Sequence, residues 1–279
     1  MKEFPSILLP RQRSNLHLVS HKSNLLAAME ILKLTEENIQ DQHICCAFSD
    51  KKCVEGYQKK KEWLKTAFKN GYTFRKLNER GKVFIEYVPI EHAWLPIAGQ
   101  NFMVINCFWV SGKFKGKGWG KKLLQACIDD AKAAGMDGVV AISSDKKRPF
   151  MSDPKFFQKQ GFTVIDEAPP FFKLYGMRIN PKANWPQIME SARQGKSPYE
   201  EGIAVYYSNT CPFTDYWVNQ HLSQYAAERN LPLHIHHIQT QAEAHQMPIP
   251  WIIQSVFYDG ELVTLEVKPD RHLDKIINL

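Results

Sequence analysis

An apolar run followed by a glycine-rich turn and a helical pattern is the feature that most constrains the fold. Residues 102–110, FMVINCFWV, are rich in β-branched and aromatic side chains and predict a strand. The composition then changes abruptly to SGKFKGKGWG, and apolar side chains between residues 121 and 135 recur at helical spacing until Gly135. The sequence therefore predicts a strand, a glycine-rich turn and a helix in succession.

The glycine-rich turn has the chemistry of an anion site. Gly116, Gly118 and Gly120 alternate along it, so neighbouring backbone N–H groups can point one way at the positive end of the helix dipole. The spacing differs from the G-x-G-x-x-G dinucleotide fingerprint, and no Ser or Thr follows the lysine as in a P-loop. We expect a pyrophosphate and a ribose phosphate here, with a plain solvated turn as the alternative. The surrounding cations are Lys113, Lys115, Lys117, Lys121 and Lys122.

Strands dominate the chain before this turn, and we expect them to be mostly antiparallel. The predicted elements are strands at 30–35, 72–77, 82–90 and 93–97, a helix at 54–69, and, beyond the helix at 121–135, a strand at 138–144, a helix at 154–160 and a strand at 161–168.

A second group of elements follows residues 181–202, whose prolines, glycines and polar groups predict a linker. Cys211-Pro212 lies at the turn between the first strand and the first helix of this group. The predicted elements are a strand at 203–208, a helix at 212–229, a strand at 233–238, a short helix at 241–247, a hairpin turning at Asp259-Gly260 and a helix at 270–279.

Length and charge also divide the chain in two. Its 279 residues, 44% hydrophobic and 23% charged, suit a soluble globular protein of about two domains without a membrane span. Residues 1–196 carry 32 Lys+Arg against 19 Asp+Glu, whereas residues 197–279 carry 4 against 10. The first part therefore favours anionic ligands. Nucleic-acid binding is a third hypothesis, but KKKEWLK is better explained by a solvated helix face and FKGKGWGKK by the anion site.

The N-terminus and the cysteines bear on processing and compartment. Residues 1–28 lack a signal-peptide core, so we expect a poorly ordered extension, with a start at Met29 favoured over a transit peptide. The six cysteines have no spacing suited to zinc or to a disulfide framework, which indicates a reducing cytoplasm. The predicted parts are an extension 1–28, a domain 29–180, a linker 181–202 and a domain 203–279.

The glycine-rich turn and its surroundings resemble the GNAT acetyltransferases. The residues Lys115 to Gly120 match the family's Q/R-x-x-G-x-G/A loop, although a Lys stands where the family has Gln or Arg, and KFFQKQGF resembles its late segment. The resemblance covers residues 30–175. HICCAFSDKK, FIEYVPIEHAW and INCFWVSGKFKGKGWG further resemble the YoaP-type subgroup. The resemblance implies an α+β mixed-sheet domain, then a smaller α/β thioredoxin-like domain, and direct N-acetyl transfer from acetyl-CoA to a small-molecule or peptide amine.

The resemblance also implies roles for individual residues. The end of the strand at 102–110, which corresponds to the family's fourth strand, and the loop bind the cofactor through Phe108, Trp109, Val110, Lys115, Gly116, Lys117, Gly118, Trp119, Gly120 and Lys121. Glu86 is the preferred proton acceptor over Glu91 and His92. Phe157 stands where the family has a tyrosine acid, so the acid is Tyr87, Ser152 or a water. Cys107 is read as a packed core thiol rather than a nucleophile.

The C-terminal elements resemble a monothiol glutaredoxin-like version of the thioredoxin fold. Cys211 at a helix N-terminus should have a lowered pKa, and Thr214 replaces a second cysteine. The alternative function is therefore a thiol-redox or glutathione-binding protein that uses Cys211. Ile249-Pro250 is expected to be a cis bond. We expect surface histidines rather than a metal site at His234, His236 and His237.

Overall fold

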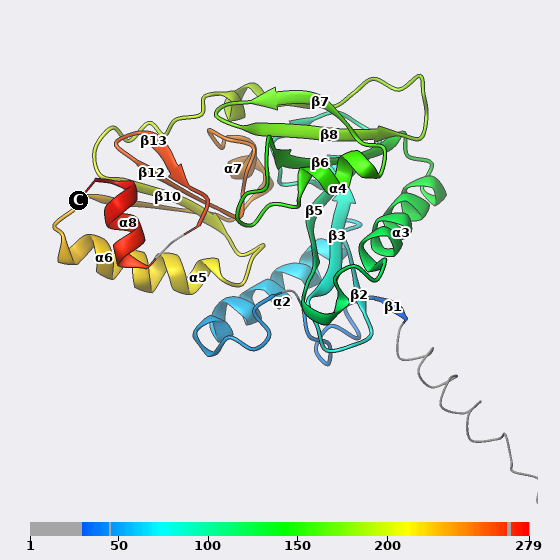
Figure 1. Cartoon of the computed structure of the whole chain (residues 1–279), viewed down its shortest axis with the longest axis horizontal. Helices are drawn as coiled ribbons and strands as arrows, with labels where there is room; N and C mark the ends of the chain where they lie inside the picture. The colour runs from blue at the N-terminus through cyan, green and yellow to red at the C-terminus, as the bar shows by residue number, and fades with distance from the viewer. Residues whose placement is uncertain (1–29, 45, 267–268, 279) are drawn as a thin grey trace, which may run out of the picture.

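The computed structural model describes residues 30–44, 46–266 and 269–278 (Figure 1). The predicted extension 1–28 and the expected start at Met29 lie outside these residues. No helix within the described ranges is long and apolar enough to cross a bilayer.

A seven-stranded sheet forms the first part, with the strand order β1-β2-β3-β5-β6-β8-β7. Neighbouring strands run antiparallel except β5 and β6, which are parallel. This mixed sheet confirms the α+β class that was expected here. Its strands are β1 (Ile31–Lys33), β2 (Thr73–Leu77), β3 (Val83–Pro89), β5 (Phe102–Val110), β6 (Gly138–Ser144), β7 (Thr163–Ala168) and β8 (Phe172–Arg178).

Helices cover both faces of this sheet (Figure 1). Helix α2 (Val54–Phe68) packs on the face of β3 that carries Phe84. Helix α3 (Trp119–Ala133) packs on the face that carries Ile85, and α4 (Pro154–Lys159) adds to the same side. Because side chains alternate along a strand, neighbouring residues of β3 serve different helices. Short 3-10 helices span Lys51–Cys53, Ile90–His92, Gly112–Phe114 and Glu190–Arg193.

Strand β5 bulges and then separates from β6. Glu86 pairs with Cys107 and Tyr87 pairs with Ile105, which leaves Asn106 as an extra residue in β5. Pairing between β5 and β6 also ends at Ile105. The following residues of β5 therefore have no strand partner on the β6 side within the described chain.

A four-stranded sheet forms the C-terminal part, in the order β11-β10-β12-β13 with β10 and β11 parallel. Its strands are β10 (Ile203–Ser208), β11 (Leu233–Ile238), β12 (Gln254–Tyr258) and β13 (Glu261–Thr264). Its helices are α5 (Thr214–Tyr216), a π-helical segment Trp217–Leu222, α6 (Ser223–Glu228), α7 (Gln241–His245) and α8 (Asp270–Ile276).

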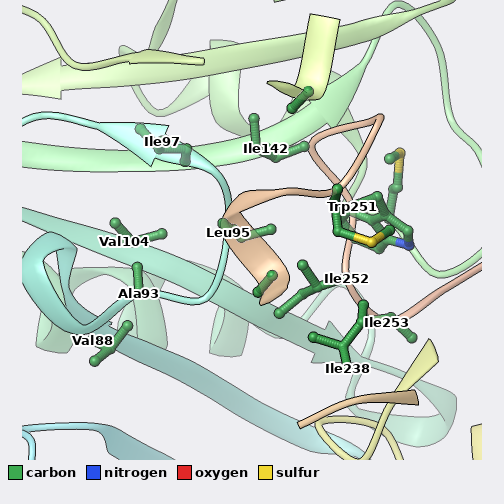
Figure 2. Packing of buried hydrophobic residues seen from close by; sticks show 14 of the residues in the cluster. Val88, Ala93, Leu95, Ile97, Val104, Ile142, Ile238, Trp251, Ile252 and Ile253 are labelled. Carbon is green, nitrogen blue, oxygen red and sulfur yellow. The ribbon is translucent and has the colours of Figure 1, made fainter. Parts of the chain in front are cut away.

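One apolar cluster joins the two parts. Figure 2 shows Leu95 and Ile142 of the first part packed together with Ile238 and Ile252 of the second. A Cβ added to Gly56 of α2 would lie 2.3 Å from the carbonyl oxygen of Pro212. The two parts therefore pack closely enough to share a site.

Polar contacts reinforce this packing. Lys59 donates to Asp215 at 2.8 Å, and the side chain of Gln241 donates to the carbonyl oxygens of Glu91 and Ala93 at 2.9 and 3.1 Å. These bonds connect α2 and the segment after β3 with the C-terminal helices.

Several expectations need correction. Strand β4 (Ile97–Ala98) leaves the main sheet and pairs with β9 (Gln187–Ile188), a strand within residues 181–202. Strand β8 was missed, although it lies between β6 and β7. The bond Ile249-Pro250 is trans, so the prediction of a cis bond was wrong; the cis bond among the described residues is Pro169-Pro170.

Candidate functional site

Residues 115–121, the glycine loop, lead from the end of β5 into α3. Gly116 and Gly118 have φ angles of 73° and 80°, in the left-handed region that favours glycine. A Cβ built at either position would find open space within 4 Å. Glycine is therefore needed here for the backbone conformation, and the surface above it is free to receive a ligand.

The backbone amides of the glycine loop fit an anion. Within the described chain, no N–H group of residues 116–121 donates to a protein acceptor, and the first such bond of α3 runs from Lys122 to Gly118 at 3.1 Å. Free amides at a helix N-terminus bind phosphate groups. None of the ion pairs among the described residues involves Lys115, Lys117 or Lys121, so the charge of these lysines is available to a ligand. Trp119 differs, because its side chain is buried in the core and only its backbone can contribute.

A cavity of about 250 Å³, the loop cavity, lies against this loop. Half of the predicted cofactor residues line it, namely Phe108, Trp109, Val110, Lys115 and Gly120, whereas Gly116, Lys117, Gly118, Trp119 and Lys121 do not. Ser152 also lines it and donates a hydrogen bond to the carbonyl oxygen of Phe108 at 3.3 Å. The lining residues are Phe108, Trp109, Val110, Lys115, Gly120, Lys147, Met151, Ser152, Asp153 and Phe156.

A second cavity of about 330 Å³, the interdomain cavity, lies between the two parts of the chain. The bulge in β5 lets the successive residues Asn106 and Cys107 both face it. Its lining residues are Trp63, Thr66, Ala67, Asn70, Tyr72, Glu86, Val88, His92, Trp94, Leu95, Asn106, Cys107, Thr210, Gln239, Trp251, Ile252 and Ile253.

A buried ion pair forms one side of the interdomain cavity. The Nζ atom of Lys60 lies 2.6 Å from one carboxylate oxygen of Glu86, and both side chains are 1% exposed. The hydroxyl of Tyr72 donates to the other oxygen at 2.7 Å. Burial, followed by the charge of Glu86, raises the pKa of Tyr72 well above its usual range. The carboxylate is thus fixed in position and stabilised by a cation.

Tyr87 does not join Glu86. It lies on the α3 face of β3, where its hydroxyl donates to Asp130 at 2.6 Å and accepts from Arg75 at 2.8 Å. Burial raises the pKa of Tyr87 far above its usual value, with Asp130 adding to the effect. The prediction of Tyr87 as an acid at the cleft is therefore corrected, because strand alternation directs it away.

Cys211 also differs from its prediction. Helix α5 begins at Thr214, and the half-buried Cys211 packs at the junction of the two parts. Burial raises the pKa of Cys211 to about 11, although Lys60 and the Phe213 amide act in the opposite direction. The expected lowering of its pKa was wrong because desolvation outweighs the helix N-terminus. Burial likewise raises the pKa of Cys107 well above its usual range, which fits a packed thiol.

Of the remaining candidates, only His92 lines the interdomain cavity. Glu91 accepts the amide N–H of Asn101 at 2.6 Å outside it. The expectation of surface histidines on β11 was wrong: His234, His236 and His237 are half-buried and stack on tyrosines, as His237 does on Tyr207 with centroids 4.6 Å apart.

The sequence reading missed the groups that complete the cavity. Lys60 was assigned to a solvated helix face, yet it is buried beside Glu86. Trp251 comes from the C-terminal part and is 3% exposed. A run of lysines gives no local signal that one of them is buried, and only the fold brings Trp251 close to β5.

Comparisons with known proteins give two family matches and one similar relative. Residues 36–162 match the family described as Acetyltransferase (GNAT) family, and residues 232–275 match one described as YoaP-like. The protein named "Uncharacterized N-acetyltransferase YoaP" of Bacillus subtilis (strain 168) is 42% identical over 247 residues, which cover 88% of this chain and 98% of that protein.

Solved structures give weaker likenesses. The Salmonella typhimurium protein yncA with its cofactor acetyl-CoA has 17% identity and a TM-score of 0.41, covering 56% of this chain and 97% of its own. A GNAT family acetyltransferase from Brucella melitensis in complex with acetyl-CoA has 18% identity and a TM-score of 0.37, covering 57% and 92%. On the strength of the Bacillus subtilis relative, matched along almost its whole length, the chain belongs to the GNAT acetyltransferase family and has a YoaP-like C-terminal segment.

Proposed function

We propose that this chain transfers the acetyl group of acetyl-CoA directly to the amine of a small molecule held in the interdomain cavity. As a GNAT family member it is an acetyl-CoA-dependent N-acetyltransferase; the place of the acceptor is what we add. One observation carries the proposal: consecutive residues of β5 line different cavities, Cys107 the interdomain cavity and Phe108 the loop cavity. A donor and an acceptor placed in these cavities would meet at one point of the strand.

The donor side follows from the free backbone groups. In this proposal the amides of the glycine loop hold the diphosphate of acetyl-CoA, and the unpaired edge of β5 from Phe108 to Val110 receives the pantetheine arm. A backbone N–H at this edge polarises the thioester carbonyl, whose oxygen gains negative charge during transfer. Acetyl-CoA itself supplies the activated acyl group.

The acceptor amine must lose a proton before or during attack. We propose Glu86 as the proton acceptor, because its carboxylate lines the interdomain cavity opposite Cys107. Lys60 and Tyr72 each occupy one lone pair of the carboxylate, and each oxygen retains another for the amine or a bridging water. His92 lines the same cavity and is the second candidate. Ser152, in the loop cavity, or a water protonates the leaving thiolate.

We also propose that the C-terminal part is a thioredoxin-like domain. Its strand order, with one parallel pair and one antiparallel hairpin, supports a thioredoxin-like domain. We do not extend this to thiol-redox chemistry, because the raised pKa of Cys211 leaves little thiolate at neutral pH. A cytoplasmic location remains a prediction from the cysteine spacing.

Blocking the interdomain cavity tests the proposal. Thr66 is exposed on α2 and lines the cavity, so Thr66→Trp should obstruct it without disturbing the core. Glu62→Trp, on an exposed position of the same helix outside the cavity, is the matched control. We expect Thr66→Trp to raise the KM for an amine about tenfold or more, the loss of one well-packed contact, with an unchanged Kd for acetyl-CoA by calorimetry. Equal KM values in both variants would place the acceptor elsewhere.

A further inference from the structure

We infer that the acceptor is a monoamine with an uncharged, apolar body, and that the C-terminal part selects it through the wall formed by Trp251, Ile252 and Ile253. The inference rests on the proposed function, since it names the substrate class of the same cavity. It follows from the charge, the aromatic content and the origin of the lining residues.

The charge of the cavity excludes most amine classes. Among the described residues that line it, Glu86 is the one formally charged side chain besides the imidazole of His92. The charge of Glu86 is already balanced by Lys60 at 2.6 Å. An amino acid would bury its carboxylate without a cation, and a polyamine or aminoglycoside would bury several ammonium groups without carboxylates. Each unpaired buried charge is costly, so these acceptors are disfavoured.

Aromatic rings form the side of the cavity next to the ion pair. Trp63 contacts Tyr72 edge to face with centroids 5.0 Å apart, and contacts Trp94 edge to face at 5.6 Å. Rings arranged in this way present faces and edges to an apolar ligand and can attract an ammonium group before it is deprotonated. An aryl or alkyl group next to an amine matches both properties.

A further part of the wall belongs to the C-terminal part of the chain. Trp251, Ile252 and Ile253 are all buried, and they pack in the cluster that joins the two parts (Figure 2). Thr210 and the exposed Gln239 complete this side. The first part alone would leave the cavity open, so the C-terminal segment determines which acceptor bodies fit.

The test separates binding from transfer. Three tryptophans line the cavity, so binding of 2-phenylethylamine to the full chain should change its intrinsic fluorescence with or without acetyl-CoA. Spermidine, phenylalanine and kanamycin are the competing probes. We expect saturable binding and N-acetylation of 2-phenylethylamine, with kcat/KM at least about tenfold above each competitor, the cost of one unpaired buried charge.

The two failures are distinguishable. Preferred acetylation of spermidine, phenylalanine or kanamycin would overturn the inference and leave the transferase intact. Saturable binding of 2-phenylethylamine without transfer, in protein that binds acetyl-CoA, would instead overturn the proposed function. Absence of both binding and transfer for 2-phenylethylamine would overturn the inference.

Two substitutions test whether the C-terminal wall selects the acceptor. Trp251→Ala should raise the KM for 2-phenylethylamine and leave that for acetyl-CoA unchanged; Trp217→Ala, a half-buried tryptophan of the same part outside the cavity, is the control. Gln239→Glu changes an exposed position and need not affect folding. The added carboxylate should lower the KM for a diamine by about two- to fivefold. An unchanged amine profile in folded Trp251→Ala and Gln239→Glu would refute the role of this wall.

Discussion

The free amides of the glycine loop depend on residues that are neighbours in the sequence. The interdomain cavity, in contrast, is formed by segments that lie far apart in the sequence. The loop amides are free because they precede and begin α3, and Gly116 and Gly118 adopt the positive φ angles of the turn that leads into it. The cavity requires α2, β3, β5 and the C-terminal residues 251–253 to meet. If the proposed sites are correct, donor binding is encoded locally, while acceptor choice depends on how the two sheets pack.

The same contrast appears within β3. Glu86 faces α2 and the cavity and is held by Lys60, while Tyr87 faces α3 and is held by Asp130 and Arg75. Both groups are polar and both are buried in networks. Only Glu86 of the two lines the interdomain cavity, so under the proposed function the face of the strand decides which polar group can act in the reaction.

The largest expected effect is the loss of stability when the ion pair between Lys60 and Glu86 is broken. Lys60→Met leaves Glu86 buried without its cation and should lower the free energy of unfolding by about 3–5 kcal/mol, measured by denaturant titration. The double variant Lys60→Met/Glu86→Leu should recover much of this loss in stability. It should still have no N-acetyltransferase activity, because the proposed proton acceptor Glu86 is missing. A double variant with full activity would remove Glu86 from the mechanism.

The next effect concerns the glycine loop. Gly118→Leu should weaken acetyl-CoA binding about 100-fold, the equivalent of one or two hydrogen bonds to a charged group, as measured by calorimetry. Gly135→Leu is a matched control, because Gly135 also has a positive φ and open space for a Cβ but lies at the other end of α3. Equal losses in both variants would mean that backbone strain, and not the anion site, explains the result.

A smaller effect, on kcat, is expected when the hydroxyl of Tyr72 is removed. Tyr72→Phe removes the hydrogen bond to Glu86 and should lower kcat for an amine about tenfold, since a bond to a charged group contributes about 1.5–3 kcal/mol. The pH profile of kcat should change with it, while the Kd for acetyl-CoA stays constant. A changed Kd with an unchanged profile would make Tyr72 a structural residue only.

The smallest effect is expected at Cys211. With a pKa of about 11 the thiol stays protonated at pH 7.5, so iodoacetamide should modify it slowly until the pH rises well above 9. Because the folded state holds this proton more tightly than the unfolded state, its contribution to stability is complete below about pH 9 and is lost as the pH rises through 11. Because Cys211 lines neither cavity, Cys211→Ser should leave turnover within about twofold. Fast alkylation at neutral pH, followed by mass spectrometry, would revive the redox alternative.

The sequence was informative where local patterns determine structure. The strand–turn–helix unit around the glycine loop, helix α2 and the hairpin at Asp259-Gly260 follow from periodicity and turn chemistry and were confirmed. Strand β8 was missed because it follows two prolines and contains Gly176, which weakens the strand pattern.

The cavity could be predicted only in part. Strand alternation indicates that Glu86 and Tyr87 face opposite sides, but not which side is the cleft. The bulge at Asn106, the burial of Lys60 and the desolvation of Cys211 arise from tertiary packing. None of them leaves a signal in neighbouring residues.

A crystal structure with coenzyme A and N-acetyl-2-phenylethylamine tests the central claim most directly. The account predicts the diphosphate within hydrogen-bonding distance of the amides of residues 116–121, and the product in the interdomain cavity against Trp251 with its amide next to Cys107. A product bound outside this cavity, or a diphosphate held away from the glycine loop, would contradict it.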